Sequence, residues 1–150
     1  MIQLYHYAEK NNYLVAGTTN KTELAQGFYV KFGDGGVDIE PIAHLYKTQV
    51  YQLARYLGVI EEIINRPPSP DTYSLPLSDK EFYFCLDYEL LDLLLYAYLN
   101  KMAKDEIASC LHLSQEQVTR VFKDFEAKER ATWHLRELPP SIKESPFSTS

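Results

Sequence analysis

The chain has 150 residues, 45% of them hydrophobic, which suits one folded domain and argues against a wholly disordered protein. Its formal net charge of −6 argues against an extended nucleic-acid surface, because phosphate backbones require a basic face. The most apolar stretch, around Leu90–Tyr98, is too short to span a bilayer, and the N-terminus lacks the basic start of a signal peptide, so a cytoplasmic protein is expected.

The start of the chain predicts a helix, a short strand and a second helix. Leu4–Asn11 has an apolar face typical of the end of a helix, and Tyr13–Ala16 is typical of a buried strand. Asn20 and Glu23 have the spacing of a capping box, which predicts a short helix that ends at Gly27.

A glycine-rich turn follows at residues 31–38. Glycine at three of its positions indicates unusual backbone angles or a closely approaching ligand. Ile39–Ile42 favours a second short strand. Because one or two strands cannot form a sheet alone, we expect residues ahead of this chain to supply further strands.

The rest of the chain predicts helices. Tyr46–Leu57 is amphipathic and should stop at Gly58, and a turn of helix is expected within Ile60–Asn65. The prolines of residues 67–76 predict a rigid, irregular loop.

Three further helices are expected, at Tyr88–Leu99, Lys104–Leu111 and Ser114 to about Thr132, the last with a capping box at Ser114. An apolar stripe on the first of these helices is expected to pack into a core. The two cysteines, Cys85 and Cys110, have apolar neighbours and are expected to be buried thiols. The fold class is therefore α/β, with a helical second half.

Residues able to bind a nucleotide concentrate around the turns of the front half. Thr18 follows a predicted strand, where open α/β sheets bind ligands. Glu23 offers the hard oxygen that Mg²⁺ uses beside phosphates, and Lys31 and Lys47 suit phosphate oxygens. Each residue alone fits a capped helix or a solvated face, but together with Gly-Asp-Gly-Gly they predict a site.

Three runs carry a family resemblance. Leu-Val-Ala-Gly-Thr-Thr-Asn-Lys-Thr-Glu-Leu-Ala-Gln-Gly-Phe is followed by Lys-Phe-Gly-Asp-Gly-Gly-Val-Asp-Ile-Glu-Pro-Ile and by Leu-Tyr-Lys-Thr-Gln-Val. In this combination the chain resembles the ammonia-dependent NAD synthetases, densely over residues 14–69 and more loosely to residue 140. The resemblance implies the C-terminal part of a Rossmann-like, adenine-nucleotide α-hydrolase-like domain. That part would comprise a nucleotide-site half at residues 1–70 and a helical half at 71–140, with a mobile tail at 141–150.

The resemblance also implies an activity and the residues that serve it. The family amidates deamido-NAD with ammonia and Mg-ATP through an acyl-adenylate, and acts as a homodimer. By this resemblance the ATP contacts would be Thr18, Lys47 and Ser69. Glu23 would hold Mg²⁺. The deamido-NAD contacts would be Lys31, Asp34, Asp38 and His134. No nucleophilic side chain is implied, and no partner beyond the small-molecule substrates and a second subunit.

The sequence departs from the family pattern at two points. The phosphate loop, Ser-Gly-Gly-x-Asp-Ser, and its Mg²⁺-binding aspartate are absent, so we expect the isolated chain to be inactive. Where the family often has His-Lys near the end, this chain has His134-Leu135-Arg136, and Arg136 is the cation that can replace the lysine.

Two other functions are open on sequence grounds. Residues 104–132 resemble a helix-turn-helix, whose second helix carries polar side chains that can read DNA bases; a helical hairpin with a packed core explains the same pattern. The parent enzyme can also be a divergent amide ligase that acts on a different carboxylate.

Overall fold

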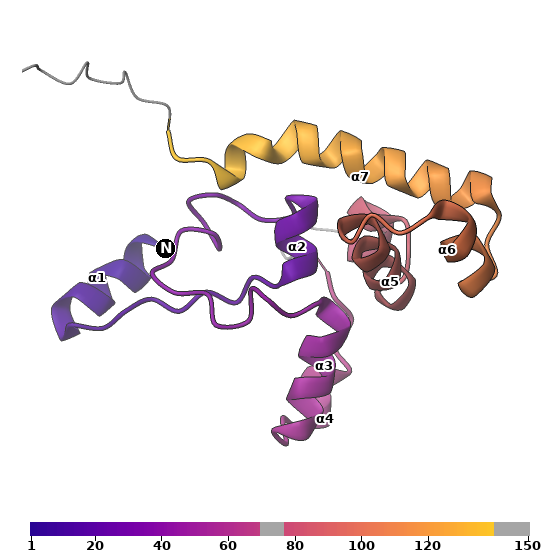
Figure 1. Cartoon of the computed structure of the whole chain (residues 1–150). Helices are drawn as coiled ribbons and strands as arrows, with labels where there is room; N and C mark the ends of the chain where they lie inside the picture. Colours follow the sequence, from indigo (N-terminus) through magenta and orange to yellow (C-terminus); the bar gives the residue numbers. More distant parts are fainter. Residues whose placement is uncertain (70–76, 140–150) are drawn as a thin grey trace, which may run out of the picture.

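The computed structural model describes residues 1–69 and 77–139. The helices of these residues are α1 (Ile2–Asn11), α2 (Lys21–Gln26), α3 (Lys47–Tyr56), α4 (Glu61–Ile64), the π-helix η1 (Lys80–Phe84), α5 (Tyr88–Leu99), α6 (Lys104–Cys110) and α7 (Gln115–Arg136). In Figure 1, α2 lies between the long α7 and the loops of the front half, whereas α1 lies at the opposite end of the molecule from α6. No helix in the described ranges is both long and apolar enough to cross a membrane.

The two expected strands appear only as an isolated pairing within the described residues. Ala16 and Ile39 form a single parallel bridge, in which the Gly17 amide donates to the Ile39 carbonyl at 2.7 Å. The segments Tyr13–Ala16 and Ile39–Ile42 therefore run side by side without forming a sheet, since two short strands are marginal on their own. The Rossmann-like α/β class stays a prediction.

The hydrophobic core lies in the helical half. Leu91, Leu94 and Leu95 of α5 are fully buried, together with Val118 and Phe125 of α7. Ile107 of α6 joins them, and Leu90 and Tyr98 pack at the edge of this cluster. The expected core stripe on α5 is thus confirmed, and the hairpin of α6 and α7 also has the packed core that one interpretation of its sequence predicted.

The front half is attached to this core through aromatic rings and through α2. The Phe28 ring stacks on Tyr83 with centroids 4.8 Å apart and meets Phe84 edge-on at 5.0 Å. At the end of α2, Gly27 has a φ of +69° and lies so close to α7 that a Cβ at this position would be 2.2 Å from the Thr132 hydroxyl. Glycine is required here both by the backbone angle and by the neighbouring helix.

Local signals predicted the helix ends well. Both capping boxes form, at Asn20 with Glu23 and at Ser114 with Gln117. α5 has the predicted bounds, α1 begins at Ile2 rather than Leu4, and α7 continues to Arg136. η1 was not predicted. The expected irregular tract at 70–76 and the expected mobile tail at 141–150 lie outside the described residues.

The predicted burial of the two cysteines was wrong. Cys85 and Cys110 are exposed, whereas the nearby apolar side chains of Phe84 and Ile107 take the buried positions. The glycines of the turn do not adopt positive φ angles. Instead, a Cβ at Gly35 would lie 2.6 Å from the Tyr29 ring, and one at Gly36 would lie 3.2 Å from the Phe32 backbone, so these glycines allow close packing within the turn.

Candidate functional site

Glu23 and Lys47 meet at the start of two helices. The Lys47 Nζ lies 2.9 Å from Glu23 Oε1, and the side chains are 21% and 16% exposed respectively. Glu23 Oε2 also accepts from the Asn20 amide at 3.1 Å, which completes the cap of α2. Local capping thus fixes the carboxylate, and the fold brings the lysine to it from 24 positions further along the chain.

Lys47 is held in place by a buried relay. Its backbone amide donates to the Thr22 hydroxyl at 3.0 Å, and that hydroxyl donates to Asp92 at 2.5 Å. The other oxygen of Asp92 accepts from the Thr48 amide at 2.8 Å. Asp92 on α5 therefore accepts from the Thr48 amide directly and supports the Lys47 amide through Thr22. An acidic group is favourable here because the start of a helix is the positive end of its dipole.

A second buried carboxylate lies close to this ion pair. Asp79 is 6% exposed, and its Oδ2 accepts from the Tyr88 hydroxyl at 2.9 Å, while its Oδ1 has no partner among the described residues. Burial raises the pKa of Asp79, although the Tyr88 hydrogen bond and the Lys47 charge act in the opposite direction. Burial also raises the pKa of Tyr88, and the charges of Asp79 and Glu23 add to this effect.

Glu23 is suited to share in holding Mg²⁺. Each of its oxygens accepts one hydrogen bond and keeps a lone pair. In the part of the chain that the structure describes, no group of three or more His, Cys, Asp or Glu side chains can hold a metal ion by itself. One carboxylate combined with phosphate oxygens is a coordination that Mg²⁺ uses, so Glu23 fits such an ion as a single protein ligand.

Ser69 shares a hollow with Lys47. This hollow of about 280 Å³ is also lined by Tyr51 and Arg66 and by the double proline that precedes Ser69. Thr18 is exposed and directly follows the bridge between residues 16 and 39. Of the three expected ATP contacts, the structure thus brings together two.

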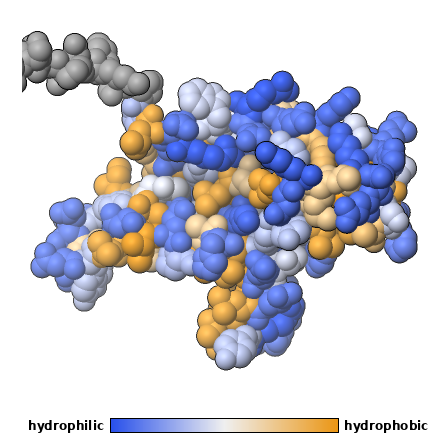
Figure 2. Space-filling model, viewed as in Figure 1, coloured by the Kyte–Doolittle hydropathy of each residue, from blue (hydrophilic) through white to orange (hydrophobic). Residues whose placement is uncertain are grey.

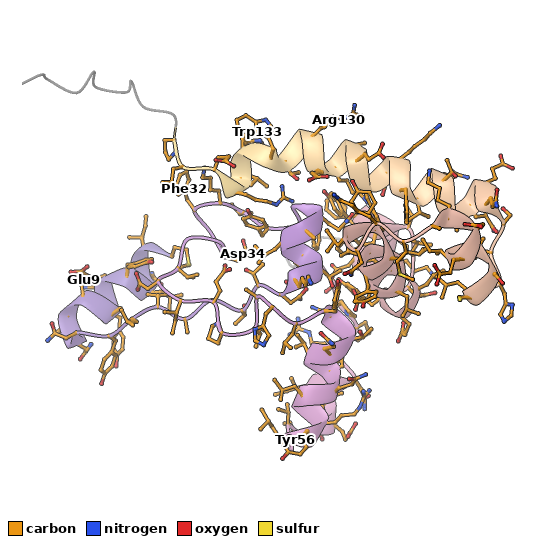
Figure 3. All side chains as sticks on the ribbon, viewed as in Figure 1. Glu9, Phe32, Asp34, Tyr56, Arg130 and Trp133 are labelled. Atoms are coloured by element: carbon orange, nitrogen blue, oxygen red, sulfur yellow. The ribbon has the colours of Figure 1, made fainter. Side chains whose placement is uncertain are left out.

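Two of the four expected dinucleotide contacts, Lys31 and Asp38, line a different and larger hollow, whereas Asp34 and His134 are not in its lining. It measures about 1050 Å³ and lies between α1, the glycine turn and the end of α7; its lining includes Lys31 and Asp38. Lys31 Nζ donates to the carbonyls of His134 and Glu137, which joins the turn to the end of α7. Figure 3 shows Phe32 of this turn beside the C-terminal end of α7, with Trp133 on that helix nearby.

The acidic residues of the turn also hold its shape. Asp34 accepts from the Val30 amide at 2.7 Å, and Asp38 accepts from the Val15 amide at 2.7 Å and from the Tyr5 hydroxyl at 3.3 Å. Burial raises the pKa of Glu40 in the wall of the larger hollow, and the Asp34 charge adds to this effect. Lys31 and Lys47, which the sequence grouped as one cluster, line separate hollows.

Arg136 also lines the larger hollow, but its guanidinium is hydrogen-bonded to α2. Its guanidinium donates to the Leu24 carbonyl at 2.7 and 2.9 Å and to the Ala25 carbonyl at 2.9 Å. It therefore satisfies the last carbonyls of α2, where a cation complements the helix dipole. The replacement of the missing lysine by Arg136 in the dinucleotide region stays a prediction, since this arginine lies in the wall of the hollow but its guanidinium is engaged with α2.

Sequence reasoning missed Asp79, Tyr88 and the relay through Asp92. Asp92 had a detectable signal, since it is a charged residue in the middle of an otherwise apolar helix face. Asp79 had none, because it lies beside an irregular tract where no periodicity indicates which side chains are buried.

Comparison with known proteins identifies relatives of the chain. A sequence model of the family described as NAD synthase matches residues 1–139. An NH3-dependent NAD(+) synthetase from Mesorhizobium japonicum is 53% identical over 135 residues, which are 90% of this chain and 42% of that protein. The chain thus spans less than half the length of this curated relative, as expected of a C-terminal part.

Solved structures agree. The structure of NMN synthetase from Francisella tularensis superposes with a TM-score of 0.74 at 27% identity, covering 95% of this chain and 52% of that one. An NH3-dependent NAD synthetase from Campylobacter jejuni, in complex with the nitrate ion, gives a TM-score of 0.68 at 26% identity, covering 95% and 51%.

Proposed function

The chain belongs to the NAD synthase family, and we propose that it forms the C-terminal part of an ammonia-dependent ligase that amidates deamido-NAD at the expense of ATP. The observation that carries this proposal is the contact between Glu23 and Lys47, with Ser69 in the same hollow as the lysine. A carboxylate able to share Mg²⁺ and a lysine suited to phosphate oxygens are thereby fixed at one place.

Each part of the site has a role in this chemistry. Formation of an acyl-adenylate displaces pyrophosphate, so negative charge builds up on phosphate oxygens. Lys47 is held by its backbone relay and meets that charge without reorganising, which is the most effective form of electrostatic stabilisation. Bound Mg²⁺ would supply further neutralisation of the phosphates. Ammonia supplies the nitrogen, so no nucleophilic side chain is required.

We assign the larger hollow to the dinucleotide. Its volume of about 1050 Å³ is at the upper end of the range of ligand pockets, and Lys31 with Asp38 lie in its wall. Thr18, Asp34 and His134 retain the ATP and deamido-NAD roles expected by resemblance. Completion of the site by a second subunit and by the family's phosphate loop belongs to the same proposal, and the isolated chain is then inactive.

The test joins the chain to the part of the Mesorhizobium relative that it does not match, placed ahead of residue 1. We expect this chimera, given Mg-ATP, deamido-NAD and ammonium, to form NAD, and the 150-residue chain alone to form none. Lys47→Ala should lower kcat by about 100-fold. Lys123→Ala, an exposed lysine on α7, is the matched control and should retain activity.

The carboxylate substrate is tested in the same assay. Because one structural neighbour is named an NMN synthetase, nicotinate mononucleotide is offered in parallel with deamido-NAD. Preference for deamido-NAD supports the proposal, and preference for the mononucleotide contradicts its substrate. Turnover by the isolated chain would contradict its inactivity.

A further inference from the structure

Asp79 is a buried carboxylate with an unused oxygen. Its Oδ2 accepts from the Tyr88 hydroxyl at 2.9 Å, whereas its Oδ1 has no hydrogen-bond partner in residues 1–69 and 77–139. Asp79 is only 6% exposed, so water compensates little for the missing bond. Because a buried polar atom without a partner is costly, such an atom calls for a functional explanation. The free oxygen is an acceptor for a donor that can reach it.

Lys47 is the charged donor beside this carboxylate. Its Nζ lies 5.5 Å from the centre of the Tyr88 ring, and the hydroxyl of the same ring donates to Asp79. Burial raises the pKa of Asp79, but the Lys47 charge lowers it, as expected of opposite charges close together. Tyr88 thus holds the carboxylate of Asp79 near the lysine ammonium.

Lys47 has N–H groups to share. An ammonium has three donors, and within the described ranges of the chain only the one toward Glu23 has a hydrogen-bond partner. The hollow of about 280 Å³ that Lys47 and Ser69 line does not include Asp79 in its wall. In Figure 2, the side of α3 and α4 that faces away from α1 shows mostly hydrophilic atoms, which suit the approach of a charged ligand. Asp79 therefore reaches Lys47 from the protein interior, and a phosphate reaches it from the hollow.

The pairing of Glu23 with Lys47 conflicts with the roles proposed for both residues. Glu23 is suited to Mg²⁺ and Lys47 to phosphate oxygens, but an ammonium 2.9 Å from Glu23 Oε1 repels a metal ion at that carboxylate. Lys47 has to turn away when a cation takes its place. Since a lysine carries its charge on a flexible stem with rotatable donors, it can turn to another acceptor without movement of α3.

We propose that Asp79 is a positioning residue for Lys47. Its free Oδ1 receives the ammonium when Glu23 is neutralised by a cation, and the lysine keeps its remaining N–H groups for phosphate oxygens in the hollow. Asp79 acts through the lysine alone. This inference rests on the proposed function, because it deepens the role given there to Lys47.

A double-mutant cycle on the 150-residue chain tests this exchange without metal or turnover. Glu23→Gln represents the neutralised carboxylate, because glutamine can keep the cap of α2 but no longer attracts Lys47. At pH 7, Asp79→Asn should leave the unfolding temperature of the parent chain unchanged or raise it, since Lys47 is paired with Glu23. In the Glu23→Gln background the same change should lower the unfolding temperature by about 2–4 °C, because the lysine loses its remaining carboxylate.

Asp87→Asn is the matched control for this cycle. Asp87 is an exposed carboxylate that pairs with Lys80, and its replacement should have the same effect in both backgrounds. If Asp79→Asn also has the same sign and size of effect in both backgrounds, the proposal is wrong.

A second cycle measures the binding of Mg-ATP to the chimera by calorimetry. Asp79→Asn should weaken this binding by about 10-fold. In the Lys47→Ala background the same change should weaken it by less than about 2-fold, because Asp79 then has no lysine to position. A loss that persists without Lys47 would overturn the proposal, since Asp79 would then act on the metal or on the fold directly. A parent chimera that binds no Mg-ATP contradicts the proposed function, whereas the cycle on the chain alone still decides whether Asp79 receives Lys47.

Discussion

Asp92 shows how one side chain can organise a site that it does not line. Its two oxygens accept from the Thr22 hydroxyl and the Thr48 amide, which come from α2 and α3. A charged group that is 4% exposed is costly unless such bonds satisfy it. Here the bonds fix the start of α3 and hence the position of Lys47.

Replacement of Asp92 should therefore destabilise the chain. We expect Asp92→Ala to lower the free energy of unfolding by about 1–3 kcal/mol, because the Thr48 amide and the Thr22 hydroxyl lose their buried acceptors. Urea denaturation measures this loss. Asp124→Ala removes an ion pair with Lys128 in which the Asp124 side chain is 49% exposed. This change should lower the free energy of unfolding by less than about 1 kcal/mol. Equal losses in the two variants would contradict the role given to Asp92.

Asp79 should make stability depend on pH. Burial raises its pKa above the ordinary value of 3.8, so the folded chain binds this proton more tightly than the unfolded chain. The contribution of this group to stability is then fully present below pH 3.8 and decreases as pH rises through the raised pKa.

Asp79→Asn removes this titration. Relative to the parent chain, the variant should become progressively more stable as the pH rises from 4 to 7, measured by urea denaturation at each pH. Asp105→Asn, at an exposed carboxylate on α6, should show a smaller change. A difference between parent and variant that is constant across this pH range would show that Asp79 has the same pKa in both states.

At the scale of elements, the contact between α2 and α7 holds the two halves together. Gly27 ends α2 against Thr132, and Arg136 from the last turn of α7 binds the final carbonyls of α2. The short α2 is thus stabilised by a tertiary contact at one end and by its capping box at the other.

Two glycines separate backbone strain from helix packing. Both have φ near +70°, but a Cβ at Gly58 meets nothing within 4 Å, whereas one at Gly27 meets Thr132 at 2.2 Å. Gly58→Ala should lower the free energy of unfolding by about 1–2 kcal/mol, because it strains only the backbone. Gly27→Ala should cost at least about 1 kcal/mol more, because α7 must move. Thermal unfolding of both variants tests the difference. Equal losses of stability would mean that α7 can shift away from α2 without a free-energy penalty.

At the scale of the whole molecule, stability should come from the helical half. The buried leucines of α5 lie there, whereas α1 buries a single alanine. Removal of residues 1–11 should therefore change the unfolding free energy by less than about 1 kcal/mol, whereas Leu95→Ala should cost about 2–5 kcal/mol. Denaturation monitored by circular dichroism compares the two. A large loss on removal of α1 would show that this helix already has its packing partner within the chain.

The sequence by itself determined the helices, their caps and the family of the chain. Capping boxes and apolar stripes depend on residues three or four positions apart, so Asn20 with Glu23, Ser114 with Gln117 and the core face of α5 could be recognised locally. The motif runs that indicated the family are also local. Only the tertiary structure decided which side chains meet over long separations. It joined Glu23 to Lys47 and placed Lys31 in another hollow. It also bound the Arg136 guanidinium to α2 and packed Gly35 of the turn against Tyr29. These outcomes depend on how the elements pack, and a pattern along the chain carries no measure of distance between elements.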